Sequence, residues 1–179
     1  MLFRSACSLP ALRSLRFNIA GRLGIAVIAL AGLQAVLGLT PLIFDDLQVY
    51  QLTAPAQFLA HGRLVEIPWN VLANSPMALQ LTLGMSLSFD ADGAVAKLLL
   101  TILGLILPLA VSELFSNRKA GLLAALFVLC YPEFWTHQTF GVIDLAVAGF
   151  LIAGAVWTRR ALEESGWDGV ILAGCAFGF

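Results

Sequence analysis

The sequence has little charge. Asp, Glu, Lys and Arg make up 12% of the 179 residues, whereas hydrophobic residues make up 60%. A soluble domain is typically about half apolar and about a quarter charged. The formal net charge is -1, so the chain has no basic surface that could neutralise the phosphates of a nucleic acid. The composition therefore predicts an integral membrane protein and argues against a nucleic-acid partner.

The sequence also lacks the short motifs of soluble cofactor chemistry. It has no glycine-rich phosphate loop, no Cys or His pair at metal-binding spacing, and no Ser nucleophile elbow. The cysteines Cys7, Cys130 and Cys175 are scattered, and two of them lie in apolar runs, so we interpret them as packing residues. These absences argue against soluble nucleotide chemistry and zinc chemistry.

The N-terminus has no acidic residue before Asp45. Its basic residues are Arg4, Arg13, Arg16 and Arg22. Such a segment is typical of a signal peptide or an organellar transit segment. The apolar run Gly24 to Phe44 would cover about 30 Å as a helix, which matches a bilayer core and is too long for a cleaved signal. We therefore predict a basic cytoplasmic N-terminus (1–23) and a membrane domain (24–179) that begins with a retained signal anchor, with a transit peptide as the alternative.

Later apolar runs predict further transmembrane helices. The runs Ala94 to Phe115 and Gly141 to Trp157 should each cross the membrane, and Ala120 to Tyr131 should form a shorter span between them. A last run begins near Val170 and reaches Phe179. We predict an all-α fold with four full transmembrane helices and the start of a fifth. We expect the chain to be the N-terminal part of a longer protein.

Basic residues predict the orientation of these helices, because short cytoplasmic loops are enriched in Lys and Arg. With four spans, the N-terminal arginines, the pair at 118–119 and the pair at 159–160 fall on one side, which we assign to the cytoplasm. Glu113 at that side should pair with a nearby base. Only Arg63 and Lys97 remain on the other side. The acids of that outer side are Asp45, Asp46, Glu66, Asp90, Asp92, Glu133 and Asp144.

The outer segment 45–93 contains two predicted surface helices. Between Asp46 and Ala60, apolar residues recur at helical spacing, which suits an amphipathic interfacial helix that stops at Gly62. Residues Pro76 to Phe89 alternate between apolar and polar, a period that favours a strand. A lone strand in lipid would leave its backbone groups unpaired, and Pro is typical of a helix start. We therefore predict a second helix there, lying at or dipping into the outer interface.

Three features of the outer side are candidates for chemistry. Asp45 and Asp46 end the first apolar run, and ionised side chains are costly in hydrocarbon, so the pair should lie at the membrane surface or in a watered cavity. It could be a helix cap, a solvated helix end, or a base and cation-binding pair. Asp144 lies about a turn inside the fourth apolar run and is either functional or a helix cap. His137 is a loop histidine that could be a ligand or incidental.

These features occur in a recognisable order. The motifs are Asp45-Asp46 with Tyr50, then Phe58-Leu59-Ala60-His61-Gly62, then Asn74-Ser75-Pro76, then the turn Leu114 to Ala125, Pro132 and Asp144. This order resembles the GT-C class of membrane glycosyltransferases, in particular the bacterial relatives of protein O-mannosyltransferases and of the aminoarabinose transferase that modifies lipid A. The resemblance covers roughly residues 24–179.

The resemblance implies transfer of a sugar from a polyprenyl-phosphate donor to a lipid, glycan or protein acceptor on the non-cytoplasmic face, as in a bacterial inner membrane. It implies that Asp45 is the base and that Asp46 orients it or shares a divalent cation with it, with Asp144 as a further candidate cation ligand. The candidate substrate-binding residues are Tyr50, Arg63, Asn74, His137 and Asp144. No other cofactor is implied.

Two points bear on this interpretation. The named branches often carry Lys or His beside the Pro that opens the second surface helix, and Asn74-Ser75-Pro76 has neither, which leaves the phosphate contact open. The alternatives are a transporter or permease component and a non-catalytic subunit of a membrane complex. Transporters place polar groups near the bilayer midplane, whereas here the mid-span residues are nearly all apolar, apart from Gln34, Thr101 and Pro108. This distribution favours chemistry at the surface.

Overall fold

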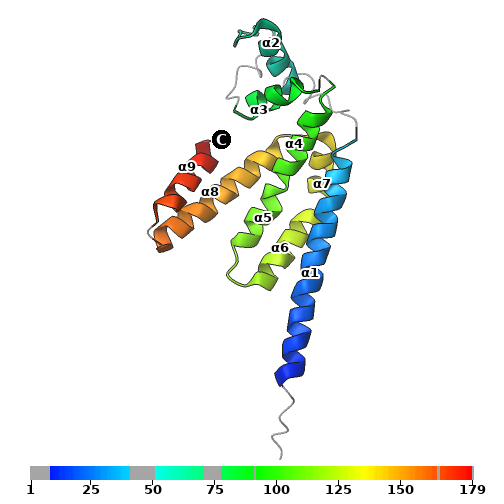
Figure 1. Cartoon of the computed structure of the whole chain (residues 1–179), viewed down its shortest axis with the longest axis vertical. Helices are drawn as coiled ribbons and strands as arrows, with labels where there is room; N and C mark the ends of the chain where they lie inside the picture. Colours follow the sequence, from blue (N-terminus) through cyan, green and yellow to red (C-terminus); the bar gives the residue numbers. More distant parts are fainter. Residues whose placement is uncertain (1–8, 41–50, 71–77, 91, 165, 179) are drawn as a thin grey trace, which may run out of the picture.

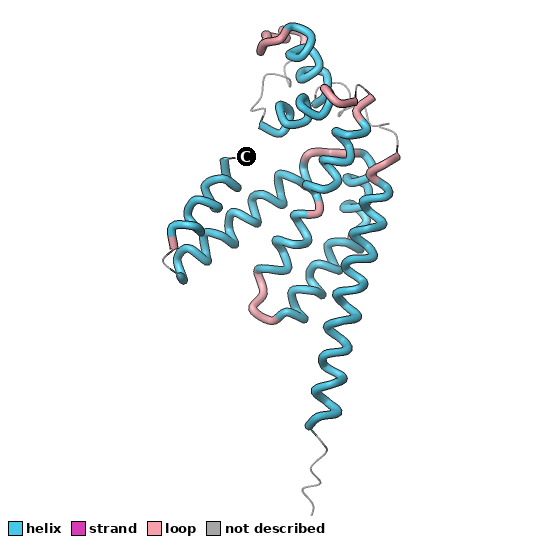
Figure 2. Tube along the Cα trace, in the orientation of Figure 1, coloured by secondary structure: helices cyan, strands magenta, loops and turns pink. Residues whose placement is uncertain are grey.

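The structure, a computed structural model, describes residues 9–40, 51–70, 78–90, 92–164 and 166–178. The regular elements within these ranges are all helices, joined by short turns (Figure 2). In chain order they are α1 (Leu9–Leu37), α2 (Thr53–His61), α3 (Ala78–Leu87), α4 (Ala94–Gly104), α5 (Ile106–Glu113), α6 (Arg118–Cys130), α7 (Pro132–Phe140), α8 (Asp144–Glu164) and α9 (Trp167–Gly178). The predicted all-α fold is confirmed for this part of the chain.

Three helical segments in the described ranges are long and apolar enough to cross a membrane. They are Ala20–Leu37 in α1, Ala94–Glu113 in α4 and α5, and Asp144–Glu164, which is α8. The predicted third span forms α6, whose 13 residues would cover about 20 Å and so fall short of a bilayer core of about 30 Å. The structure supports an integral membrane protein, and the count of four full spans stays a prediction.

The helix of the second span is interrupted just before Pro108. Helix α4 ends at Gly104 and α5 begins at Ile106, so Leu105 separates them. Pro108 has no N–H to donate to the carbonyl of Gly104, four residues earlier, and its ring crowds that carbonyl. A break one turn before a proline is the expected result.

Helix α6 does not continue through Pro132. Tyr131 is extended (φ -71°, ψ 127°), and Pro132 opens α7 at a position where a missing N–H costs nothing. The indole Nε1 of Trp135 donates to the carbonyl of Leu129 and holds α7 against the end of α6. Residues 132–140, which the sequence predicted as part of an outer loop, are therefore a helix, and Gly141 (φ 72°) ends it.

Helices α2 and α3 lie together beyond one end of the bundle, next to the start of α4 (Figure 1). A buried cluster of Leu52, Leu83, Ala96 and Leu100 joins them to α4. Gly62 (φ 61°) ends α2, as predicted. Helix α3 has ten residues and would cover about 15 Å, too short to cross a bilayer. A helix rather than a strand is confirmed for residues 78–87, whereas its position at the membrane interface stays a prediction.

The remaining helices pack side by side. Helix α6 lies between α1 and α5, and α8 packs against α4 and α5 (Figure 1). Close approach needs glycine: a Cβ at Gly149 of α8 would lie 2.9 Å from the backbone nitrogen of Leu107. Helix α9 runs back along α8, where a Cβ on Gly154 would meet the ring of Phe177 at 2.8 Å.

Candidate functional site

The helix bundle has two chemically different ends. At one, which we call the Lys97 end, α1 ends and α4 and α8 begin. At the other, the Arg159 end, α5 ends, α6 begins and α8 approaches its own end. Lys97 and Glu113 are 16 residues apart on α4 and α5, so the two ends are separated by about 24 Å.

The Lys97 end is organised by a buried ammonium group. Lys97 lies in the first turn of α4 and its side chain is 0% exposed. Its Nζ donates to the backbone oxygen of Thr40 at 2.7 Å and to the Thr40 hydroxyl at 2.5 Å. The hydroxyl in turn donates to the carbonyl of Leu37 at 2.8 Å, in the last turn of α1. Lys97 therefore ties the end of α1 to α4, at a helix end where positive charge is favoured.

His137 lies at the same end, between two carboxylates. Its Nδ1 is 3.9 Å from Oδ2 of Asp144 and its Nε2 is 4.0 Å from Oε2 of Glu133. These separations exceed hydrogen-bond length, and Nδ1 is buried without a hydrogen bond. The structure thus brings together two of the predicted site residues, His137 and Asp144, in an arrangement that a small movement would convert into hydrogen bonds.

Asp144 is the first residue of α8, and its side chain is exposed. A carboxylate in the first turn of a helix is favoured by the positive end of the helix dipole. The interpretation of Asp144 as a helix cap therefore has support. Its carboxylate also lies 3.9 Å from Nδ1 of His137, so a functional role stays a prediction.

An apolar pocket opens beside His137. Its volume is about 310 Å³, and apart from His137 it is lined by Leu107, Phe127, Val128, Tyr131, Glu133, Phe134 and Leu145. The walls come from α5, α6, α7 and α8. A pocket of this kind suits an apolar chain better than a polar one.

Arg63 belongs to a different part of the molecule. It follows Gly62 at the end of α2 and lines a groove of about 470 Å³ between α2 and α3, together with Phe58, Leu64 and Met85. Its side chain is exposed, and no described carboxylate lies within ion-pair distance of it. The structure does not bring Arg63 into contact with His137 or Asp144.

Four predicted site residues, Asp45, Asp46, Tyr50 and Asn74, lie outside the described residues. Among the residues that the structure does describe, no group of three or more His, Cys, Asp or Glu side chains could hold a metal ion. The divalent cation that the resemblance allows, with Asp45, Asp46 or Asp144 as ligands, stays a prediction.

The Lys97 end continues inward as buried polar groups. Thr101 is 0% exposed and its hydroxyl donates to the carbonyl of Lys97 at 3.0 Å. Gln138 of α7 donates from Nε2 to the carbonyl of Thr101 at 3.2 Å. Gln34 of α1 is also 0% exposed, and neither of its amide atoms has a hydrogen-bond partner. A buried polar group without a partner costs about 1–3 kcal/mol.

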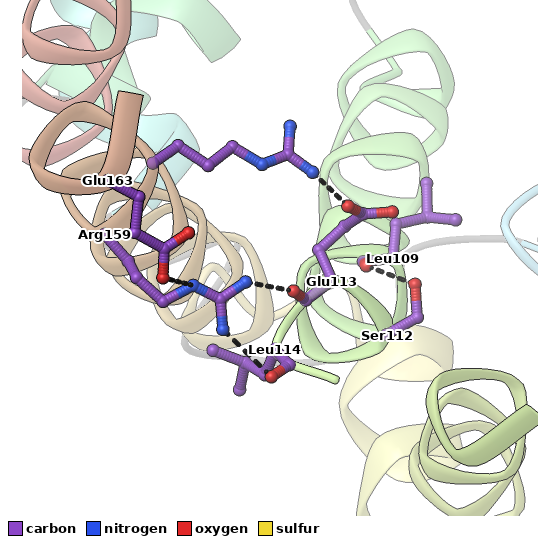
Figure 3. A network of polar contacts seen from close by, with 7 residues as sticks. Leu109, Ser112, Glu113, Leu114, Arg159 and Glu163 are labelled. Carbon is purple, nitrogen blue, oxygen red and sulfur yellow. Dashed lines mark hydrogen bonds and ion pairs between the residues drawn. The ribbon is translucent and has the colours of Figure 1, made fainter. Parts of the chain in front are cut away.

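The Arg159 end has a different network, shown in Figure 3. Arg159 donates from Nη1 to the carbonyl of Leu114 at 3.0 Å and from Nη2 to that of Glu113 at 2.9 Å, and so satisfies the end of α5. Arg160 pairs with the carboxylate of Glu113 and lies 4.9 Å from the ring of Trp157. The predicted pairing of Glu113 with a nearby base is confirmed.

No protein-family model, curated protein or solved structure matches this chain.

Sequence reasoning missed Gln138 and undervalued Lys97 as site residues. Gln138 was missed because residues 132–140 were predicted to be a loop, in which no helical spacing relates a glutamine to other residues. Lys97 and Thr101 are spaced by four residues in an apolar run, which places them on one helix face, and this spacing could have identified them as a buried pair.

Proposed function

We propose that the chain belongs to an enzyme that transfers a sugar from a polyprenyl-phosphate donor to an acceptor at the non-cytoplasmic membrane surface. The observation that carries the proposal is the separation of charge along the bundle. His137 and Asp144 lie at the Lys97 end, whereas Arg159 and Arg160 lie at the Arg159 end. Under the positive-inside rule the Lys97 end faces away from the cytoplasm.

The described residues at this end suit a lipid-linked substrate. The apolar pocket beside His137 opens on the bundle surface, so a donor dissolved in the bilayer could approach without crossing water. The ring nitrogens of His137 can form hydrogen bonds to a polar group of the substrate, and Asp144, whose Oδ2 is 3.9 Å from Nδ1, can orient the ring. These two residues are therefore candidates for binding the substrate.

The departing phosphate needs a cationic partner. Lys97 is buried and already donates to Thr40, so we expect it to hold α1 and α4 together and not to contact the phosphate. Arg63 is exposed and lines the groove between α2 and α3, so it is the better placed of the two to reach a phosphate at the surface.

Asp45 is the proposed base, because it ends the first apolar run and matches the acidic motif of the GT-C class. Asp46 would orient Asp45 or share a cation with it. The fold that we propose is GT-C-like, with four spans and two interfacial helices. Tyr50 and Asn74 complete the proposed substrate contacts.

The test is transfer of a radiolabelled sugar from polyprenyl phosphate by the full-length protein in liposomes. We expect wild-type protein to transfer the sugar and Asp45→Asn to slow transfer by about 10²–10⁴-fold, the usual contribution of a general base. Asp92→Asn is the matched control, since Asp92 is an exposed outer-segment aspartate. Wild-type transfer that Asp45→Asn leaves unchanged would refute the base assignment, and absence of transfer from every such donor would refute the proposal.

The second candidate function is a transporter component. The buried amide of Gln34, inside the first candidate span, is the observation that favours it, because transport paths place polar groups within the membrane. Uptake of a labelled solute into liposomes, unaffected by Asp45→Asn, would support this candidate over the first.

A further inference from the structure

Gln34 is the least explained polar residue in the described part of the bundle. It lies in the candidate span Ala20–Leu37, its side chain is 0% exposed, and both its amide nitrogen and its amide oxygen lack a partner. Buried polar groups in proteins are nearly always hydrogen-bonded, either to protein or to ordered water. Gln34 therefore points to a ligand that satisfies a donor and an acceptor together.

Two contacts between α1 and α4 show what surrounds Gln34. Thr40 meets Lys97, and a Cβ built on Gly38 would lie 2.4 Å from Oγ1 of Thr101. Residue numbers fall along α1 as they rise along α4, so the helices are antiparallel here, as Figure 1 also shows. Gln34 is four residues before Gly38, about 6 Å along α1, which brings it level with Gly104 and Leu105.

Gln138 reaches the same level from α7. A Cβ on Gly104 would lie 2.7 Å from Nε2 of Gln138, so this amide lies directly against the Gly104 backbone. Gln138 is 3% exposed. Two buried carboxamides from different helices therefore face one turn of α4.

The backbone at this turn offers a further acceptor. The carbonyl of Gly104 would normally accept from the N–H of residue 108, but that residue is Pro108, which has none. Kinks of this kind in membrane helices are commonly satisfied by neighbouring side chains or ordered water.

We propose that Gln34, Gln138 and the Gly104 carbonyl form a binding site for ordered water inside the membrane bundle. Water both donates and accepts, which a carboxamide with two free atoms requires. A metal cation fits less well, because no described carboxylate is part of this cluster and the ammonium of Lys97, seven residues from Gly104 on α4, repels positive charge.

The bundle interior is apolar on the side of the Arg159 end. Beyond Gly104, the buried residues of α5 are Pro108 and Ala110, and those of the adjoining part of α6 are Gly121 and Ala125. These are apolar and offer water no side-chain partner. On this proposal the water site is a blind pocket and not a pore, and the proposal holds whether or not the protein transfers sugars.

Solid-state NMR of the protein in lipid bilayers tests the proposal through magnetisation transfer from water to side-chain amides. We expect early transfer to the amides of Gln34 and Gln138, comparable to that of Gln57 in α2, and slow transfer to the backbone amides of Leu33 and Val36, whose side chains are exposed on the bundle surface. Transfer to Gln34 as slow as to Leu33 would overturn the proposal.

A variant shows whether the two amides share one site. Gln34→Leu keeps the volume and removes both polar atoms, so we expect loss of early water transfer to Gln138. Gln57→Leu is the matched control and should leave the Gln138 signal unchanged. Early transfer to Gln138 that survives in correctly folded Gln34→Leu protein would contradict a shared site. Ion leak through liposomes carrying the wild-type protein would contradict the blind pocket.

Discussion

The two ends of the bundle use charge in opposite ways. At the Arg159 end, Glu113, Arg159 and Arg160 are each bonded across helices, and their side chains remain partly exposed. At the Lys97 end, the ammonium is wholly buried against Thr40, and His137 stands 3.9 Å from Asp144 without a hydrogen bond. The Arg159 end has partly exposed polar contacts between helices, whereas the Lys97 end combines a buried charge with polar groups that could form further hydrogen bonds.

Removing the buried charge should have the larger effect. Lys97→Met keeps the length of the side chain but leaves the Thr40 carbonyl without its donor. We therefore expect the free energy of unfolding to fall by about 1.5–3 kcal/mol, which is typical of hydrogen bonds to charged groups. Unfolding in mixed micelles with increasing denaturing detergent measures this.

Lys119→Met is the matched control for that experiment. Lys119 lies at the start of α6, at the Arg159 end, and is partly exposed, so its replacement should change stability by less than about 0.5 kcal/mol. If both substitutions lowered the free energy of unfolding by the same amount, the proposed difference between the two ends would be wrong.

The partly exposed ion pair between Glu113 and Arg160 should contribute less to stability. A double-mutant cycle of Glu113→Gln and Arg160→Met should give a coupling of about 0.2–1 kcal/mol that shrinks as salt is added, because the pair is partly solvated. Arg159 is not part of this coupling, since its guanidinium donates to backbone carbonyls that both substitutions retain. A coupling well above this range, or one insensitive to salt, would mean that the Arg159 end is as dry as the Lys97 end.

The sequence predicted what depends on local chemistry. The stop at Gly62 and the pairing of Glu113 each follow from one residue and its near neighbours, and the structure confirms both. The length of the first apolar run likewise predicted a span in α1.

What the sequence did not predict depends on packing between distant segments. Whether Pro132 ends a span or starts a new helix is decided by contacts of α7 with α6, such as Trp135 with Leu129. The burial of Lys97 needs Thr40, 57 positions earlier, and the Gln138 contact with Thr101 spans 37 positions. The periodicity of a single segment carries no information about such contacts. The sequence therefore could not show that Arg63 and His137 line two different cavities.

We propose that the Lys97 end and the Arg159 end lie on opposite sides of a membrane. Cysteine accessibility tests it directly, after Cys7, Cys130 and Cys175 have been replaced. Asp92→Cys and Asn117→Cys introduce thiols at exposed positions just before α4 and just after α5. We expect a membrane-impermeant maleimide to label position 92 in intact cells and position 117 only after permeabilisation. Labelling of both positions from the same side would contradict it.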